Sequence, residues 1–166
     1  FLLWAVQGIR KLSSKAHVTF RTVPAGGGIH PLETYLVINR VGSLPEGLYR
    51  YLPLEHKLLF LRPINPAWSE QLGDACRGQE FVSQGAVVFI WTAIPYRAEW
   101  RYANEAHKDI ALYAGHACQN LYLASEAIAA GTCAITGYAQ KAMDSLLDVD
   151  GEQEFVVYVA PVGKVS

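Results

Sequence analysis

Residues 21–33 read RTVPAGGGIHPLE, and the three consecutive glycines Gly26–Gly28 are the most informative feature of the chain. The glycines lie between Pro24 and His30, and the strand-like run Thr34–Arg40 follows. Glycine adopts positive φ without steric cost and lets a ligand approach the backbone closely. Consecutive bare N–H groups suit an anionic or polar ligand. A tight surface turn is the alternative, because glycine-rich loops are common between secondary-structure elements.

The segments beyond this loop predict a sheet. Thr34–Arg40 is rich in β-branched and aromatic residues, which is typical of a strand. Gly47–Leu52 and Lys57–Leu61 flank a proline turn and predict a hairpin. Gly85–Thr92 is short and apolar throughout, as expected of a buried central strand, and Glu154–Val159 reads as a final strand.

Helices are predicted between and before these strands. Phe1–Val6 reads as the end of a helix, Ala67–Cys76 and Gln140–Leu147 as short helices, and Ala106–Ala130 as a long one that Gly131 ends. The polar stretch 11–22 reads as an exposed connection. The pattern predicts an α+β fold with a mainly antiparallel central sheet flanked by helices.

The long helix carries a stripe of small and apolar residues at helical spacing. The stripe consists of Ile110, Ala114, Ala117, Leu121, Ala124 and Ile128. Small residues allow another helix to approach closely, as in a tight bundle or a dimer core. His116, Gln119 and Asn120 interrupt this helix, and a buried polar side chain must find a partner. We expect them to bond to a neighbouring loop or to face a ligand.

Length and composition predict a single domain over residues 1–166. Half of the chain is hydrophobic (51%) and 17% is charged, so a sizeable core can form. The net charge of −1 argues against nucleic acid as the main partner. No run approaches the roughly 20 apolar residues of a membrane span. Because the chain opens within a helix-like segment, we expect an N-terminal segment to be missing.

The three cysteines, Cys76, Cys118 and Cys133, are widely spaced and form no metal-binding pattern. We therefore expect small buried side chains in a reducing compartment, which predicts a cytoplasmic protein.

Five stretches, in order and with matching spacing, resemble the SagB-type dehydrogenases, which are FMN-dependent members of the nitroreductase superfamily. The stretches are Leu2–Ile9, Thr22–Glu33, Pro45–Tyr51, Gly115–Ala124 and Ala160–Gly163. Members of this family oxidise thiazolines and oxazolines in modified peptides. The resemblance implies a nitroreductase fold and an intertwined homodimer with flavin at its interface.

The resemblance also implies which residues bind FMN. One set lies against the flavin ring and ribityl chain, partly across the dimer interface: Pro24, Ala25, Gly26, Gly27, Gly28 and His30. Ala25 stands where the family usually has serine, so a contact there would rest on backbone groups. The alternative for His30 is a structural residue packed beneath the loop.

Three further positions are implied in cofactor binding. Ile135, Thr136 and Gly137 correspond to the segment that offers a backbone N–H to flavin N5, and the alternative is an ordinary helix-to-strand connection. Gly163 and Lys164 correspond to the phosphate site, where the alternative for Lys164 is a solvated tail lysine. Gln119, on the long helix, is the remaining candidate.

The catalytic candidates are Tyr102 and Arg101, where azoline-oxidising members have a Lys-Tyr pair thought to deprotonate the substrate. Arginine stays protonated and makes a poor base. Arg101 would instead bind an anionic substrate or pair with Glu99 or Glu105. This difference favours generic flavin redox chemistry over azole formation.

One family motif has no counterpart. The Arg-Arg-Ser-x-Arg sequence that binds the phosphate and the flavin edge is absent, and the first arginine is Arg10. The sequence predicts an FMN-dependent oxidoreductase that transfers hydride through flavin N5, with NAD(P)H or an oxidisable small molecule or modified peptide as reductant. The alternative is a flavin-free or weakly binding family member that acts as a scaffold for a partner. A third alternative, an enzyme that fragments the flavin, has no particular residue in its favour.

Overall fold

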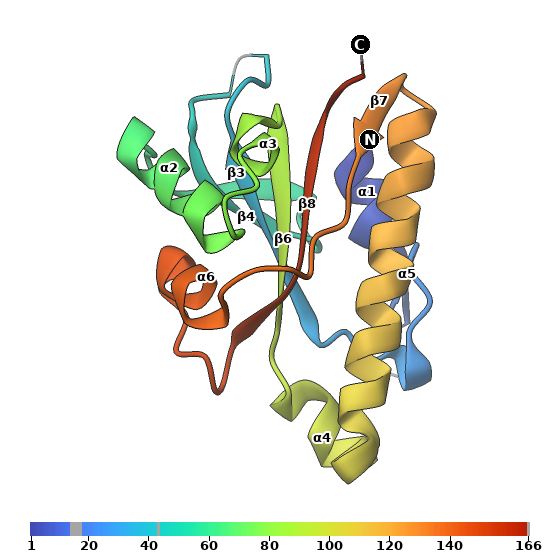
Figure 1. Ribbon diagram of the computed structural model, residues 1–166. Coiled ribbons are helices and arrows are strands. Elements are labelled where there is room, and N and C mark those ends of the chain that lie inside the picture. Colours follow the sequence, from blue (N-terminus) through green and yellow to red (C-terminus); the bar gives the residue numbers. More distant parts are fainter. Residues whose placement is uncertain (14–17, 43, 166) are drawn as a thin grey trace.

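A six-stranded sheet with the order β5-β4-β3-β6-β8-β7 forms the centre of the molecule (Figure 1). The computed structural model describes residues 1–13, 18–42 and 44–165. All neighbouring strands of the sheet are antiparallel. The strands are β3 (Leu32–Ile38), β4 (Gly47–Leu52), β5 (Lys57–Arg62), β6 (Val87–Ala93), β7 (Ala130–Thr132) and β8 (Phe155–Lys164).

Helices cover both faces of the sheet, which confirms the predicted α+β fold (Figure 1). One face carries α1 (Leu2–Gln7) and the long α5 (Ala106–Glu126). The other carries α2 (Pro66–Ala75), α3 (Phe81–Gln84) and α6 (Gln140–Leu147). The short α4 (Tyr96–Tyr102) precedes α5. In the part of the chain that the structure describes, no helix is both long and apolar enough to cross a bilayer.

Two hydrophobic cores form because successive side chains of a strand point to opposite faces. In β3, Leu36 joins the core under α1 and α5, whereas Val37 joins the core under α2 and α6. Residues 110–124 of the predicted α5 stripe are buried inside the protomer, in contact with the sheet and with α1. Only Ile128, beyond the end of the helix, is exposed. The stripe therefore packs within the chain, and the opposite face of α5 is the one left open.

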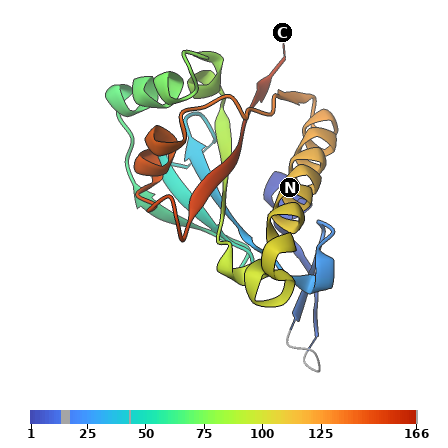
Figure 2. The same ribbon diagram turned by 60° about the horizontal axis from the view of Figure 1, so that its bottom comes forward.

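The predicted exposed connection over residues 11–22 is partly exposed but contains a strand pair, and its residues 14–17 lie outside the described residues. Strands β1 (Ile9–Ser13) and β2 (Val18–Arg21) run antiparallel and extend away from the main sheet (Figure 2). Each strand has only two apolar residues, Ile9 and Leu12 in β1 and Val18 and Phe20 in β2, so the hydrophobic pattern was too short to identify them. Backbone pairing and the bond from Arg21 Nη1 to Gln7 Oε1 hold them in place.

Two boundaries also differ from prediction. The long helix ends at Glu126, and Gly131 lies within β7. Strand β8 continues through Pro161 to Lys164. The Pro161 carbonyl accepts a bond from the Thr132 hydroxyl on the β7 side. In a strand, the N–H and C=O groups of one residue point to the same side. The N–H that Pro161 lacks would therefore point toward β7, so no hydrogen bond between β8 and β6 is lost.

Candidate functional site

The glycine loop lies against the end of α4, next to both predicted catalytic residues. Gly26–Gly28 form one short turn with Gly27 at φ 57°, a conformation that favours glycine. A Cβ on Gly27 would lie 2.7 Å from the Tyr102 hydroxyl and 3.1 Å from Arg101 Cζ. The fold thus brings together the loop, Arg101 and Tyr102, which lie far apart in the sequence. Arg101 forms no ion pair with Glu99 or Glu105 among the described residues.

Asp109, in the first turns of α5, is a third side chain at this loop that the sequence analysis missed. Its Oδ1 is 2.6 Å from the position of a Gly26 Cβ, and the Tyr102 hydroxyl is 3.2 Å from the same point. Its Oδ2 is buried and has no hydrogen-bond partner among the described residues. Burial raises the pKa of the Asp109 carboxyl above its usual value. An acidic residue early in a helix is common, so nothing in the sequence distinguished it.

A strained turn and an ion-pair network hold α4 in this position. Ala103, directly after Tyr102, has φ 45° and ψ −121°, which turns the chain sharply into α5. On the other side of α4, Arg97 Nη2 lies 2.6 Å from Glu33 Oε1. The same carboxylate binds Arg50 through Nη2 at 2.9 Å and Nε at 3.1 Å. Glu33 therefore links α4 to two strands of the sheet.

His30 is a structural residue beneath the loop, as its alternative interpretation held. Its Nε2 lies 2.9 Å from the Thr19 carbonyl, and its Nδ1 lies 2.9 Å from the Tyr113 hydroxyl. A carbonyl only accepts, so Nε2 carries the proton and Nδ1 accepts from Tyr113. Burial, followed by the nearby Arg21, lowers the pKa of His30 to about 4. The ring is therefore neutral at pH 7 and both of its nitrogens are hydrogen-bonded within the protein, and a contact of His30 with the flavin remains a prediction.

His30 predicts a specific pH dependence of stability. The pKa of His30 falls from 6.5 in the unfolded chain to about 4 in the fold. The contribution of neutral His30 to the free energy of unfolding is therefore complete above pH 6.5 and is lost as the pH falls toward 4. We expect a loss of about 2 kcal/mol, allowing for partial exposure of the ring. Urea unfolding at pH 7 and pH 4.5, compared with His30→Asn, measures it. Equal pH dependence in the two proteins would contradict the prediction.

A cleft of about 700 Å³ opens beside the first half of α5. Its walls combine apolar side chains of α5 and β8 with Thr136 and the carboxylates Glu99 and Glu152. The Ile135 N–H donates to the Val159 carbonyl and is not free for a ligand, contrary to one implied position. In contrast, the N–H groups of Thr136 and Gly137 have no acceptor among the described residues. Of these two residues Thr136 lines the cleft, so an unused backbone donor lies at its wall, and Gly137 follows directly in the chain.

The predicted phosphate residues lie at the other end of α5. Gly163 and Lys164 line a shallow hollow of about 300 Å³ and pair with β7 just after α5 ends. The glycine loop touches Asp109 at the start of α5. A helix of 21 residues is roughly 30 Å long. One protomer therefore holds the two predicted parts of the flavin site about one helix length apart.

Gln119 and His116 are exposed on the open face of α5 and form no hydrogen bond to a loop among the described residues, which leaves contact with a ligand as the open alternative. The two side chains share one face of α5, as their spacing predicted, but the buried face of the helix is the opposite one. Asn120 is the polar residue that finds a partner, donating from Nδ2 to the Ala5 carbonyl at 2.9 Å. A cofactor contact by Gln119 remains a prediction.

The cysteines divide differently from expectation, because Cys133 is exposed. Cys76 and Cys118 are buried, and burial raises the pKa of each thiol to about 11. Both thiols are therefore protonated at neutral pH, and neither has the thiolate character of a nucleophile. Among the described residues, no group of three or more His, Cys, Asp or Glu is placed to bind a metal.

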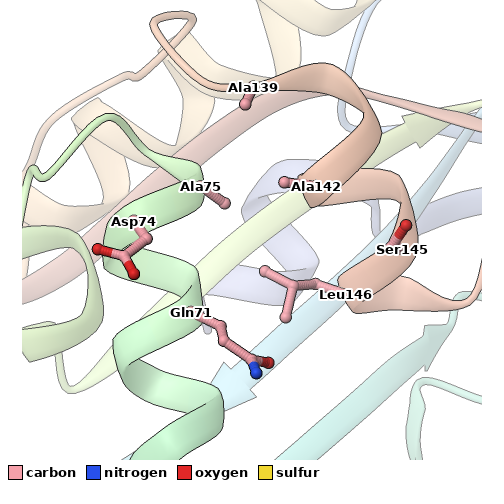
Figure 3. Close-up of a pocket in the computed structure, with 7 residues that line it drawn as sticks. All are labelled: Gln71, Asp74, Ala75, Ala139, Ala142, Ser145 and Leu146. Carbon is pink, nitrogen blue, oxygen red and sulfur yellow. The ribbon is translucent and has the colours of Figure 1, made fainter.

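A second hollow of about 380 Å³ lies between α2 and α6, on the opposite face of the sheet (Figure 3). Its walls are the small or apolar side chains of Ala75, Ala142 and Leu146, with Asp74 at the rim. It contains no residue that the sequence analysis singled out.

The comparisons with known proteins agree with this architecture. A family model described as "Nitroreductase family" matches residues 2–164. A Methanocaldococcus jannaschii protein named as a nitroreductase, MJ1384, is 27% identical over 145 residues, which cover 87% of this chain and 71% of that protein.

Two solved structures superpose over nearly the whole chain. A protein from Anabaena variabilis described as a nitroreductase has a TM-score of 0.86 and 30% identity over 97% of this chain. This chain spans only 33% of that protein. The Escherichia coli microcin synthetase McbBCD complex shares the fold, with a TM-score of 0.78, 19% identity, and coverage of 99% of this chain and 62% of the matched chain.

Proposed function

The chain belongs to the nitroreductase family, and from this premise we propose that it is an FMN-dependent oxidoreductase, nearest the SagB-type dehydrogenases. The observation that carries the proposal is the unused N–H group of Thr136, a residue that lines the cleft beside α5, with the unused N–H of Gly137 next to it in the chain. The volume of about 700 Å³ suits a flavin ring. FMN, when bound, would supply the hydride acceptor at N5, and the protein supplies orientation and electrostatics.

A homodimer is part of the proposal. The glycine loop and Lys164 are about one helix length apart in a protomer, so both can reach one FMN only if two chains contribute. The open face of α5 offers a surface for the second chain, with Gly115 free of neighbours and Leu112 and Leu123 more than half exposed. Small and apolar side chains on one helix face permit close packing across an interface.

The residues divide into three roles. The N–H groups of Thr136 and Gly137 would bind the flavin ring, and Lys164 would bind the phosphate as a point charge. The bare backbone of Gly26 and Gly27 would lie against the ring. Arg101 and Tyr102 would face the substrate, a small molecule or a modified peptide. NAD(P)H is a second candidate reductant.

The competing function is a scaffold that binds flavin weakly or not at all. Ala25 in place of serine and Arg101 in place of lysine are the observations that favour it. The two functions differ in one directly measurable property, which is whether the purified protein binds FMN.

We expect the protein to bind FMN at one per protomer, seen as a visible flavin spectrum and confirmed by mass spectrometry of the released chromophore. Gly137→Pro removes one N–H and should weaken FMN binding about tenfold or more, as titration would show. Gly137→Ala is the control, since it keeps the N–H and a Cβ there would meet only Gln79 Nε2, at 3.7 Å. A protein that stays colourless with excess FMN would contradict the oxidoreductase function and support the scaffold function. Equal affinities of Gly137→Pro and Gly137→Ala for FMN would show that the Gly137 N–H does not bind the flavin.

A further inference from the structure

We propose that Asp109 takes up the proton that the substrate loses during oxidation, with the Tyr102 hydroxyl passing the proton on. This inference rests on the proposed function, which requires a proton acceptor beside the hydride acceptor. It assigns a role to a residue that the resemblance did not include, and it answers the difficulty raised by Arg101, which stays protonated.

Both groups approach the same point beside Gly26. Asp109 Oδ1 and the Tyr102 hydroxyl lie 2.6 Å and 3.2 Å from the position of a Gly26 Cβ. Only glycine leaves that space free, so the absence of a side chain at residue 26 permits the approach. The Tyr102 hydroxyl forms no hydrogen bond with any described residue, Asp109 included, so it is available to a ligand that would lie between the two groups. Tyr102 is half-buried and Asp109 has one buried, unpartnered oxygen.

An unpartnered carboxylate oxygen in a half-buried position is unfavourable unless it serves a ligand or a proton. Burial already shifts the pKa of Asp109 upward, toward the range in which a general base works at neutral pH. The charged and titratable groups on the surrounding elements are Arg101 and Tyr102 of α4, Tyr113 of α5, His30 after the loop, and Arg21 of β2. Of these, His30 is neutral and hydrogen-bonded on both nitrogens, so it cannot replace Asp109 as the base.

The step balances as follows. A C–H bond of the substrate breaks, and FMN, when bound, would accept its hydride. One proton leaves the neighbouring atom for the Tyr102 oxygen, while the Tyr102 proton moves to Asp109. A double bond forms in the substrate, which is oxidised by two electrons. Asp109 then releases its proton to solvent, and dioxygen or an organic acceptor such as a quinone reoxidises the flavin.

The test uses the FMN-loaded protein and a synthetic peptide with one thiazoline ring. Anaerobic stopped-flow absorption measures flavin bleaching against pH. We expect Asp109→Asn to slow bleaching about 100-fold or more, the usual range for a lost general base, and to remove the fall in rate at acid pH. Asp109→Glu should restore at least part of the rate. The double variant with Tyr102→Phe should be no slower than the slower single variant, because the two residues act in one path.

A second readout needs no flavin. Carboxyl ¹³C NMR of the flavin-free protein follows the titration of Asp109, and Tyr102→Phe should move its midpoint by about 0.5 pH unit or more if the groups interact. FMN affinity and circular dichroism of Asp109→Asn should match the wild type.

The outcomes separate the inference from the proposed function. Wild-type bleaching with a rate unchanged in Asp109→Asn would overturn the role of Asp109 and leave the oxidoreductase intact. If the wild type binds no FMN, the proposed function fails. If the wild type binds FMN but does not oxidise the thiazoline peptide, the NMR titration is the test of the inference. A titration midpoint of Asp109 that is unchanged by Tyr102→Phe would then overturn it.

Discussion

Replacing Gly27 with valine is expected to weaken FMN binding by at least about 30-fold. Gly27 has φ 57°, where an L residue costs about 1–2 kcal/mol and a β-branched one more. Its side chain would also start 2.7 Å from the Tyr102 hydroxyl and 3.1 Å from Arg101 Cζ, a clash that displaces the loop or α4. Together these terms exceed about 2 kcal/mol, which corresponds to the stated change in affinity.

Gly42→Val is the matched control. Gly42 has φ 48°, so it carries the same backbone penalty, but a Cβ there has no atom within 4 Å. Fluorescence titration with FMN and urea unfolding would be measured for both variants. We expect Gly42→Val to lose some stability and keep wild-type affinity for FMN. Equal FMN affinity in Gly27→Val and wild type would show that the loop does not contact the cofactor.

The sheet and the loop could be predicted because their signals are local. An apolar run such as Val87–Ala93 and a glycine cluster beside prolines each fix a backbone state over a few residues. The helix Gln140–Leu147 was predicted to the residue for the same reason. The loop's neighbours on α4 followed only from the resemblance, since spacing alone does not relate residues some 75 positions apart.

Features set by tertiary contacts could not be predicted. Asp109 belongs to the site because Gly26, far away in the sequence, leaves room for its carboxylate. The strands β1 and β2 have only two apolar residues each, too few for a hydrophobic period to identify them. The orientation of His116 and Gln119 could have been read from the stripe, because Ala114, Ala117 and Leu121 define the buried face opposite to them.

Replacing Glu33 with alanine is expected to lower the free energy of unfolding by about 3 kcal/mol. The Glu33 side chain is only 10% exposed and binds two arginines, and its loss leaves two positive charges facing each other. Breaking a buried ion pair costs about 3–5 kcal/mol, and partial exposure of both arginines places this pair at the low end. Urea unfolding measures the change, and Glu105→Ala is the control, since its pair with Lys108 is fully exposed and should contribute nothing measurable.

Glu33 also connects stability to the site, because Arg97 is on the same short helix as Arg101 and Tyr102. Without this ion pair, the contacts that hold α4 among the described residues are its packing, the bond from Arg97 to the His30 carbonyl at 3.5 Å and the backbone bond from Ile94 to the Pro31 carbonyl at 2.8 Å. We therefore expect Glu33→Ala to slow oxidation of a thiazoline peptide under conditions where the protein is still fully folded, with less effect on FMN affinity. A variant that is destabilised but oxidises at the wild-type rate would show that α4 is positioned by its packing alone.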